Sequence, residues 1–572
     1  MSSRPDTVIG IDLGTTFSVV ACLDRNGTPQ TILNSEGDLS TPSVVYFEQD
    51  QVVVGKEALK AAVYEPESIL QHVKREMGKP TCDKPIRGLR LPPEVVQAAI
   101  LQKLRSDAET KLGGVQEAVI TVPAFFNEPR RKATMDAGRL AGLKVLDIIN
   151  EPTAAAIAYG VRAGFVSNSG EAKKPEKILV YDLGGGTFDV TLMQLEGCQY
   201  TAVATDGDVQ LGGIDWDRRI VDLVADHFVE QHGIDPRQDQ VTLQMLLKEA
   251  EDAKRALSTR TSVTVRFNYQ GKRVHVTLTR EEFEALTSDL LQRTVFTVER
   301  LLRAARWQFS DVTRILLIGG STRMPMVQQT LEQISAQGVD RSMSPDEAVA
   351  HGAALYAGFL RQGSQAADRS LVVKNVNSHD LGVLGIEKAT GMKRRRIMIP
   401  RNTRLPARSK STFVTHRGNQ RSVAVHVVEG GDDSGKNATP IGKCLVSNLP
   451  SKLPAKTPVI VQFFYAANGR LSVKAALPDT GLESSVTIER ASGMSEESLQ
   501  EWEQRLAAGR LLLGQPTPPL PGPGTPPAAA APSFVLGAPT ASAATQENLE
   551  IEGPHVFEDE ESDSEVFSDL EF

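Results

Sequence analysis

A glycine-rich turn between two apolar segments constrains this chain most strongly. The apolar run 178–181 leads to Asp182, three consecutive glycines follow at 184–186, and apolar residues alternate from Phe188 onward. This pattern predicts a strand, a tight turn and a second strand. Because glycine has no side chain and can reach positive φ, several backbone N–H groups can approach one anion. The turn is therefore either an ordinary hairpin or a phosphate-binding loop.

A second copy of the pattern favours the phosphate-binding interpretation. Residues 9–18 again give an apolar strand, Asp12-Leu13-Gly14, small residues and an aromatic residue. A repeat this far apart predicts two related lobes, each offering a hairpin to one cleft. Neither copy ends in Gly-Lys-Ser/Thr or leads into a helix, which excludes a P-loop.

Length and composition predict a soluble protein of several domains. The chain has 572 residues, which corresponds to roughly three or four domains. Its four cysteines are widely spaced and form no CxxC pair, so neither a disulfide framework nor a zinc site is indicated. The short polar N-terminus fits no secretory signal, and nine prolines interrupt the uncharged stretch 511–546. We expect a cytoplasmic protein without a membrane helix.

The negative charge is concentrated in the tail. Residues 547–572 contain eleven acidic residues and no Lys or Arg, whereas the rest of the chain carries 63 basic and 60 acidic residues. The net charge of -8 therefore says nothing about the substrate of the folded part.

The order of predicted elements indicates an α/β body followed by a β-rich domain. We expect strands at 115–122, 178–181 and 314–319, and helices at 93–108, 130–140, 153–159, 243–257, 280–303 and 345–356. Short β-rich runs at 422–429, 459–465, 471–475 and 485–488 predict a β-sandwich. One helix is expected at 495–513, and the Pro/Ala-rich and acidic segments after it cannot bury enough apolar surface to fold alone.

Six motifs in fixed order give a resemblance to the heat shock protein 70 (DnaK-type) family of molecular chaperones. They are 10–16 (GIDLGTT), 121–127 (TVPAFFN), 149–155 (INEPTAA), 182–189 (DLGGGTFD), 319–323 (GGSTR) and 345–349 (PDEAV). The resemblance covers most of residues 7–500. It implies a two-lobed actin-like ATPase domain (5–370), a linker (371–376), a β-sandwich substrate-binding domain (377–493), a short helix in place of the family's helical lid (494–513) and a disordered tail (514–572).

The resemblance assigns roles in ATP binding and hydrolysis. Asp12 and Asp182 match the carboxylates that hold Mg²⁺ largely through water, which suits a cation that dehydrates reluctantly. Lys74, Glu151 and Thr187 match groups that position the attacking water and sense the γ-phosphate. The phosphate-binding residues are Gly14, Thr15, Thr16, Phe17, Gly184, Gly185, Gly186, Gly212 and Gly213. The adenosine-binding residues are Glu251, Lys254, Arg255 and Ser258 on one helix face, with Gly319, Gly320, Ser321, Arg323 and Asp346 from the opposite lobe.

Further positions match the family's peptide-binding domain and its coupling to ATP. Pro123 and Arg131 match a relay between the nucleotide and the second domain. The peptide-groove positions are Val383, Ile386, Phe413, His416, Val423 and Val425, although alternation alone would place several of them in the sandwich core. The expected cofactors are ATP/ADP and Mg²⁺, with K⁺ as an option. The expected partners are extended polypeptide clients, a J-domain cochaperone and a nucleotide exchange factor, without nucleic acid or membrane.

At four places the sequence departs from the family pattern, which limits the family properties that can be expected of this chain. The linker contains Lys374 and Asn375 where an apolar and an acidic residue are usual, which would weaken or rewire coupling. Asp147 replaces an arginine where J-domain proteins dock, so we expect a dedicated J-domain partner or none. An insertion at 388–397 would place four basic residues (393–396) in a loop near the groove. The fourth departure is the lid, which is almost missing.

The acidic tail gives a hypothesis of self-interaction. Val566, Phe567 and Leu570 lie in an acidic setting, and residues 394–396 are basic. Tethering raises the effective concentration for such a weak contact.

Two alternatives to a hydrolysing chaperone remain at this stage. A weakly or non-hydrolysing relative could act as a regulatory or exchange-factor-like scaffold, which the altered linker and lid favour and the intact catalytic positions disfavour. A sugar kinase or filament protein on the same fold would not explain the β-sandwich.

Overall fold

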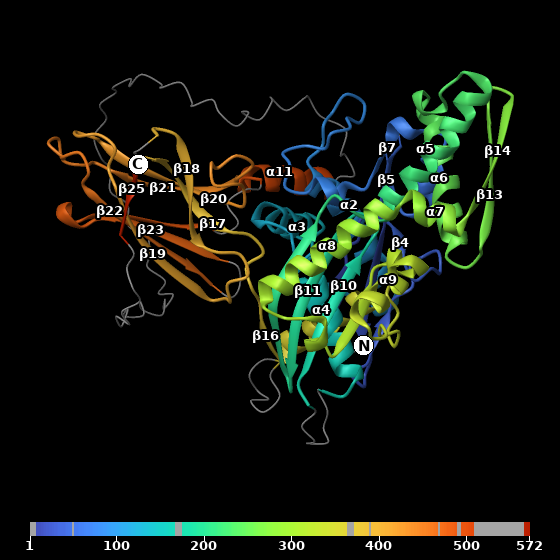
Figure 1. Ribbon diagram of the computed structural model, residues 1–572, viewed down its shortest axis with the longest axis horizontal. Coiled ribbons are helices and arrows are strands. Elements are labelled where there is room, and N and C mark those ends of the chain that lie inside the picture. Colours follow the sequence, from blue (N-terminus) through green and yellow to red (C-terminus); the bar gives the residue numbers. More distant parts are fainter. Residues whose placement is uncertain are drawn as a thin grey trace.

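The computed structural model describes residues 7–48, 51–165, 174–362, 371–387, 390–466, 470–488, 494–507 and 566–571. An α/β part lies beside a β-sandwich, with helix α11 between them (Figure 1). No helix within the described ranges combines the length and the apolar composition needed to cross a bilayer.

The first lobe of the α/β part is a mixed sheet in the order β3-β2-β1-β8-β9, with β4 also paired to β2. The β1–β2 pair is antiparallel, and β8 and β9 continue the sheet in parallel. Its strands are β1 (Thr7–Asp12), β2 (Phe17–Leu23), β3 (Pro29–Thr31), β4 (Thr41–Pro42), β8 (Val115–Val122) and β9 (Lys144–Asn150). Its helices are α2 (Pro93–Leu112), α3 (Glu128–Leu140), α4 (Glu151–Arg162) and α10 (Ala348–Gln362). A small sheet of β5 (Val44–Phe47), β6 (Val52–Val54) and β7 (Ile69–Gln71), with α1 (Lys56–Ala61), belongs to the same lobe.

The second lobe repeats this plan. Its sheet runs β15-β10-β11-β12-β16, with an antiparallel β10–β11 hairpin and a parallel neighbour, β15. The strands are β10 (Glu176–Leu183), β11 (Phe188–Glu196), β12 (Gln199–Asp208), β15 (Arg314–Ile318) and β16 (Val372–Lys374). Around them lie α5 (Gly213–His232), α6 (Gln240–Leu257), α7 (Arg280–Leu286), α8 (Ser288–Ala305), α9 (Pro325–Ser335) and the hairpin of β13 (Ser262–Tyr269) and β14 (Lys272–Thr279). The internal repeat predicted from the two glycine-rich turns is thus a repeat of strand arrangement.

One predicted helix is wrong as a single element. The apolar periodicity of 280–303 continues across residue 287, but the structure has two helices, α7 and α8, that meet there. Thr287 is buried and leaves helical geometry, with φ −114° and ψ 11°, while its hydroxyl donates to the Phe283 carbonyl at 2.8 Å. The Thr287 amide donates to the same carbonyl at 3.1 Å, so amide and hydroxyl share one acceptor where the two helices meet.

The second domain is a β-sandwich with an apolar interior. The strands are β17 (Leu381–Glu387), β18 (Lys393–Ile399), β19 (Ala407–Val414), β20 (Ser422–Glu429), β21 (Thr439–Ser447), β22 (Pro458–Tyr465), β23 (Leu471–Leu477) and β24 (Leu482–Ile488). Buried and exposed residues alternate along most of them, as expected for strands with one face inward.

The prediction that the basic residues 393–396 lie in a loop is wrong. They lie on strand β18. The side chain of Arg395 is only 4% exposed. It donates to the Gly430 carbonyl at 2.6 Å and pairs with Asp380 at 3.3 Å. These partners compensate the buried charge, which the sequence pattern alone could not reveal.

The two domains are in direct contact. Strand β16, within the predicted linker, adds to the edge of the second lobe by pairing in parallel with β12. Across the interface Arg401 reaches buried Asp206 at 3.1 Å, Asn402 accepts from the Thr205 amide at 2.9 Å, and His379 contacts the Phe125 carbonyl at 2.9 Å.

Helix α11 (Glu496–Ala507) packs on the first lobe. Leu499 and Leu506 are buried within that lobe's apolar core, and Arg139 of α3 pairs with Glu496 and Glu503. The end of the predicted helix (508–513) and residues 514–565 of the tail, both Pro/Ala-rich and acidic, lie outside the described residues. Inside the acidic tail, Val566–Glu571 forms strand β25.

Candidate nucleotide and peptide sites

The two glycine-rich turns meet between the lobes. A Cβ on Gly185 would lie 2.5 Å from side-chain atoms of Thr16, and one on Gly186 would lie 2.3 Å from Thr15. A side chain at either position would force Thr15 or Thr16 to shift, so glycine allows the turns to approach this closely. The start of α5 closes the same region, since the Gly213 amide donates to the Gly184 carbonyl at 3.0 Å. The arrangement brings backbone segments of both lobes together at one place, as the predicted phosphate site requires.

Three buried carboxylates, the half-buried Asp12 and one buried lysine lie beside these turns. Lys74 donates to Glu151 at 2.6 Å, and both side chains are less than a tenth exposed. Asp12 accepts from Thr121 at 3.2 Å, and Asp189 accepts from the Phe125 amide at 2.9 Å. Asp182 lies directly opposite Asp189 in the β10–β11 ladder. The hydroxyl-bearing Thr187 is also buried.

The electrostatics of this cluster follow from burial and like charge. Burial, then repulsion from Glu151, raises the pKa of Asp12 to about 7. The same causes raise the pKa of Asp182 well above its usual range and that of Asp189 to about 7. Burial opposes the charge of Lys74, but Glu151, Asp12 and Asp182 outweigh it and raise its pKa. The cluster has more negative than positive groups.

This donor set fits a hard divalent cation. Carboxylate oxygens are the ligands that Mg²⁺ prefers, and a cation would relieve the repulsion that raises these pKa values. In the described part of the chain no three His, Cys, Asp or Glu side chains converge as direct metal ligands. Asp12 and Asp182 would accordingly hold Mg²⁺ with water completing its coordination.

Arg75 is a site residue that the sequence reasoning missed. Its Nε donates to the Gly186 carbonyl at 2.7 Å, and its guanidinium pairs with Asp215 of α5 at 2.5 Å. It thus ties the first lobe to the second-lobe turn and to the helix behind it. Its partners are 111 and 140 residues away in sequence, so no local spacing could have identified it.

The predicted adenosine-side residues come from two elements that converge at Gly213. A Cβ there would lie 2.4 Å from Ser321 Oγ and 3.0 Å from Lys254 Nζ. Lys254 pairs with Asp217 at 2.8 Å, and Ser321 donates to the Gly184 carbonyl at 2.9 Å. On α6, Glu251 and Arg255 pair at 3.5 Å, and Ser258 is the C-cap residue. From the opposite segment, Arg323 and Asp346 pair at 2.6 Å. Gly319 there has φ 81°, and a Cβ on Gly320 would lie 3.4 Å from Asp346.

The predicted relay residue Arg131 holds the segment that follows Pro123. Its guanidinium donates to the carbonyls of Phe126 and Ala124 at 3.0 and 3.2 Å and to Asn150 at 2.7 Å. Asn150 occupies the N-cap position of α4, whose first residue is Glu151. The nucleotide cluster and the domain interface therefore share this segment.

The predicted peptide-groove residues divide into two groups. Val383, Phe413, Val423 and Val425 are fully buried in the sandwich core. Ile386, near the end of β17, and His416, two residues after the end of β19, are half-buried. Their role as a pocket stays a prediction.

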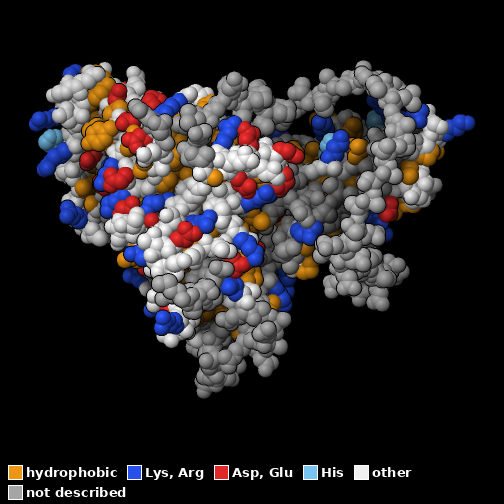
Figure 2. Space-filling model, turned by 180° about the vertical axis from the view of Figure 1, so that it is seen from behind, with side chains coloured by type: hydrophobic (Ala, Val, Ile, Leu, Met, Phe, Trp, Pro, Cys, Tyr) orange, Lys and Arg blue, Asp and Glu red, His pale blue; other side chains and the backbone are white. Residues whose placement is uncertain are grey.

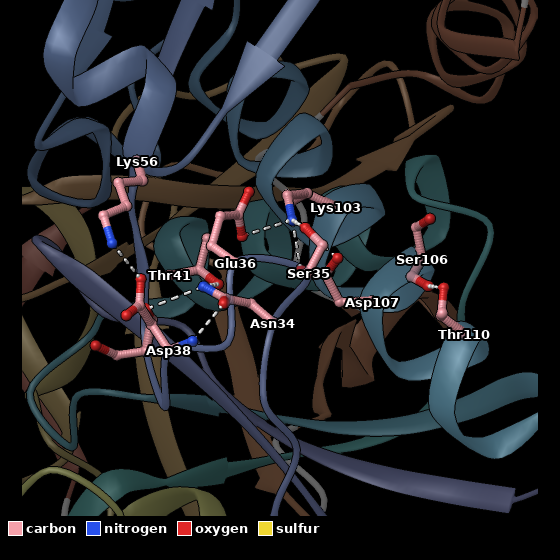
Figure 3. Close-up of polar contacts among 11 residues, drawn as sticks. Asn34, Ser35, Glu36, Asp38, Thr41, Lys56, Lys103, Ser106, Asp107 and Thr110 are labelled. Carbon is pink, nitrogen blue, oxygen red and sulfur yellow. Dashed lines mark hydrogen bonds and ion pairs between the residues drawn. The ribbon is translucent and has the colours of Figure 1, made fainter.

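A separate small cavity in the first lobe is not a ligand site. It is lined by Ser18, Val20, Ile32, Asn34, Leu39, Thr41, Leu104 and Asp107 and has room for about one water molecule. Figure 3 shows its polar surroundings, in which Lys103 reaches Ser35 and Asp107, each at 2.7 Å. These groups satisfy one another.

Comparison with known proteins identifies the family. A family model described as Hsp70 protein matches residues 8–89 and 80–511. The chain belongs to the Hsp70 protein family. It is 40% identical over 507 residues to Chaperone protein DnaK of Halobacterium salinarum, covering 87% of this chain and 77% of that protein. It is 39% identical over 523 residues to Chaperone protein dnaK1 of Parasynechococcus marenigrum, covering 86% of this chain and 76% of that protein.

Two residues at which this Hsp70 chain departs from the family pattern have defined surroundings. Asp147 on β9 accepts from Tyr356 of α10 at 2.9 Å. Lys374 in β16 is exposed and pairs in register with Thr201. The altered linker therefore still forms a strand against the second lobe.

Proposed function

We propose that this Hsp70 protein is an ATP-dependent molecular chaperone that binds extended apolar polypeptide segments and couples ATP hydrolysis to their binding. The observation that supports the ATPase most directly is the buried Lys74–Glu151 pair, 2.6 Å between Nζ and Oε1, beside Asp12 and Asp182 where the two turns meet.

The chain's own groups supply positioning and charge. Backbone N–H groups of the two turns bind the β- and γ-phosphates, and the adenosine lies between the α6 face and the 319–323 segment. Glu151 holds the Lys74 ammonium, which with Thr187 orients the attacking water. When bound, Mg²⁺ neutralises charge between the phosphates. Phosphoryl transfer relies on such positioning and neutralisation, so no strong base is required. We expect slow turnover, and K⁺ as a further cation.

Contacts across the interface support coupling between the sites. Arg131 binds the segment after Pro123, and the neighbouring Phe125 carbonyl contacts His379 of the second domain. A change at the phosphate turns can therefore reach the sandwich through a short chain of bonded groups. We also propose that the protein acts in the cytoplasm. We propose that its partners are a nucleotide exchange factor and a J-domain protein whose docking surface is adapted to Asp147.

Single-turnover ATP hydrolysis tests the proposal. Lys74→Ala removes the cation that positions water, and we expect it to slow hydrolysis on the order of 10²-fold or more. Lys60→Ala, on the exposed face of α1, is the matched control and should hydrolyse ATP like the wild type. Equal rates for wild type and Lys74→Ala would overturn the assignment and favour the non-hydrolysing alternative.

A further inference from the structure

Strand β25, from the acidic tail, is inserted between two strands of the sandwich. Its residues Leu570 and Glu571 pair in antiparallel with Glu387 and Ile386 of β17. On its other side it pairs in parallel with β19 at Thr412 and Val414, with an irregular register between them. The strand order of the sandwich is β21-β20-β17-β25-β19-β22-β23-β24, and β18 also pairs with β17, so β25 joins two four-strand groups (Figure 1).

The two host strands offer backbone edges at these residues. Strand β20 pairs with β17 only from Leu381 to Leu384, which leaves the following residues of that edge to β25. One edge of strand β19 pairs with β22 along its whole length, and the other edge pairs with β25. An extended chain placed between two such edges gains main-chain hydrogen bonds on both sides. These edges lie beside Ile386 and Phe413, two of the predicted peptide-groove residues.

Charge complementarity indicates which extended chains fit there. From 388 to 428, the stretch that includes β18 and β19, the sequence has eleven Lys and Arg residues and no Asp or Glu. The tail from 547 onward has eleven Asp and Glu residues and no Lys or Arg. Lys393 and Glu571 both lie at the register position of Ile386, one on each side of β17.

Several of these basic side chains face solvent. Lys393, Lys410, Arg417 and Arg421 are exposed, whereas Arg395 is buried and paired with Asp380. Figure 2, with the sandwich at the right, shows Lys and Arg side chains that project at its upper outer corner. Exposed basic groups around a strand-binding edge favour peptides with acidic residues near their apolar ones.

We propose that the groove between β17 and β19 selects extended segments in which acidic residues flank apolar ones, and that the chain's own C-terminus occupies it as an intramolecular competitor of clients. The sequence of β25, Val-Phe-Ser-Asp-Leu-Glu, is such a segment. The proposal rests on the proposed peptide-binding function and adds the class of peptide and its resident occupant. Because the occupant is tethered, its effective concentration is on the order of millimolar, which a client must outcompete.

Fluorescence anisotropy with a labelled peptide of residues 558–572 tests the proposal. The proteins are the full chain and a chain that ends at Gln546. We expect the shortened chain to bind the peptide at least about ten-fold more tightly, because its groove has lost the tethered competitor. Its affinity should fall as salt is raised from about 50 to 500 mM, since screening weakens the charge contribution. Equal affinities for the two chains, or no salt dependence, would overturn the proposal.

Matched peptides and variants separate this proposal from the proposed function. A peptide with every Asp and Glu replaced by Asn and Gln should bind the shortened chain about ten-fold more weakly. The double variant Lys393→Glu, Lys410→Glu should lose the acidic peptide and keep a neutral apolar peptide, whereas Lys474→Glu, on β23, should bind both like the shortened chain. Binding of the neutral peptide alone refutes the acidic preference and leaves the chaperone function standing. Binding of neither peptide refutes both.

The same measurements distinguish the chain's own tail from that of a second copy. An intramolecular occupant inhibits peptide binding to the same degree at every protein concentration. Inhibition that grows with protein concentration, together with dimers in analytical ultracentrifugation, would assign the groove to a second copy and overturn the intramolecular assignment.

Discussion

At the scale of single residues, the proposed nucleotide site depends on glycines that allow backbone segments to touch. Gly212, before α5, has extended backbone, and a Cβ on it would lie 2.5 Å from the Gly186 nitrogen and 2.6 Å from the Gly185 carbonyl oxygen. Both neighbours are backbone atoms of the phosphate turn, which cannot rotate away as a side chain can. The position therefore excludes every residue but glycine because there is no room for a Cβ atom, and not because its φ angle is unfavourable for other residues.

Gly212→Ala is expected to weaken nucleotide binding about ten-fold or more, because overpacking of about 1–3 kcal/mol must displace the turn. Gly114→Ala is the control, since a Cβ there would meet nothing within 4 Å. Isothermal titration calorimetry with ATP measures both, and thermal unfolding checks that both variants fold. Wild-type affinity in Gly212→Ala would show that the turn accommodates the methyl group and that its geometry does not determine binding.

The residues of the site were partly predictable from sequence. Asp12, Asp182 and the glycines lie in short motifs, and the spacing of residues within each motif is enough to predict a phosphate-binding turn beside a carboxylate. Arg75 does not, because its partners come from distant parts of the chain. The basic run on β18 was mispredicted for the same reason. A row of charges indicates solvent unless distant groups, here Asp380 and the Gly430 carbonyl, are known to compensate burial.

At the scale of elements, periodicity predicted most helices but fewer than half of the strands in the described part of the chain, and it predicted neither the ends of these elements nor their packing partners. It could not show the break at Thr287, where the backbone leaves helical geometry while both the amide and the hydroxyl of Thr287 donate to the Phe283 carbonyl. It predicted a helix near 495–513, whose described part is α11, and the resemblance assigned it to the lid. In the structure α11 packs on α3 of the first lobe. Which surface an amphipathic helix covers depends on apolar residues far away in sequence.

The docking of α11 should depend on its apolar side more than on its ion pairs. Leu499 is 1% exposed, whereas Arg139 and Glu496 are largely exposed. Leu499→Ala should cost about 2–5 kcal/mol of docking, and Arg139→Ala less than about 1 kcal/mol. Hydrogen exchange of residues 496–507 measures both, with Leu445→Ala on the exposed side of β21 as control. Greater exchange in Arg139→Ala than in Leu499→Ala would contradict this order.

At the scale of the whole molecule, a pair of buried carboxyl groups lies in the domain interface. Glu429 of β20 accepts from the Glu128 amide at 2.9 Å, and Glu128 accepts from the Tyr465 hydroxyl at 2.7 Å. Burial, then repulsion from Glu128, raises the pKa of Glu429 to about 8, against an opposing effect of Arg131. The residues of the first bond are 301 apart in sequence, so only the folded chain reveals the pair.

This pair predicts pH-dependent docking. Glu429 binds its proton more tightly in the docked state, where its pKa is about 8, than in the solvated state, where its pKa is that of an ordinary carboxyl group. The free energy of docking is therefore most favourable below the ordinary carboxyl pKa and becomes less favourable as pH rises toward about 8. The loss amounts to at most about 1.4 kcal/mol per pH unit. Hydrogen exchange of β16, corrected for intrinsic rates, should accelerate between pH 6 and 8.5. Glu429→Gln should remove this dependence, while Glu483→Gln, on the exposed β24, should retain it. A pH response unchanged in Glu429→Gln would assign it to other groups.

The short strand β16 gives the native chain a chemical reporter of its domain arrangement. The Val372 amide donates to the carbonyl of Cys198 at 3.0 Å, which places that cysteine beside the linker. Cys22, Cys82 and Cys444 are buried, and burial raises the pKa of each thiol, whereas Cys198 is half-buried. Because the thiolate is the reactive form, a thiol-directed reagent should modify Cys198 first. The rate of that modification would follow the linker as it leaves and rejoins the sheet, without any engineered label.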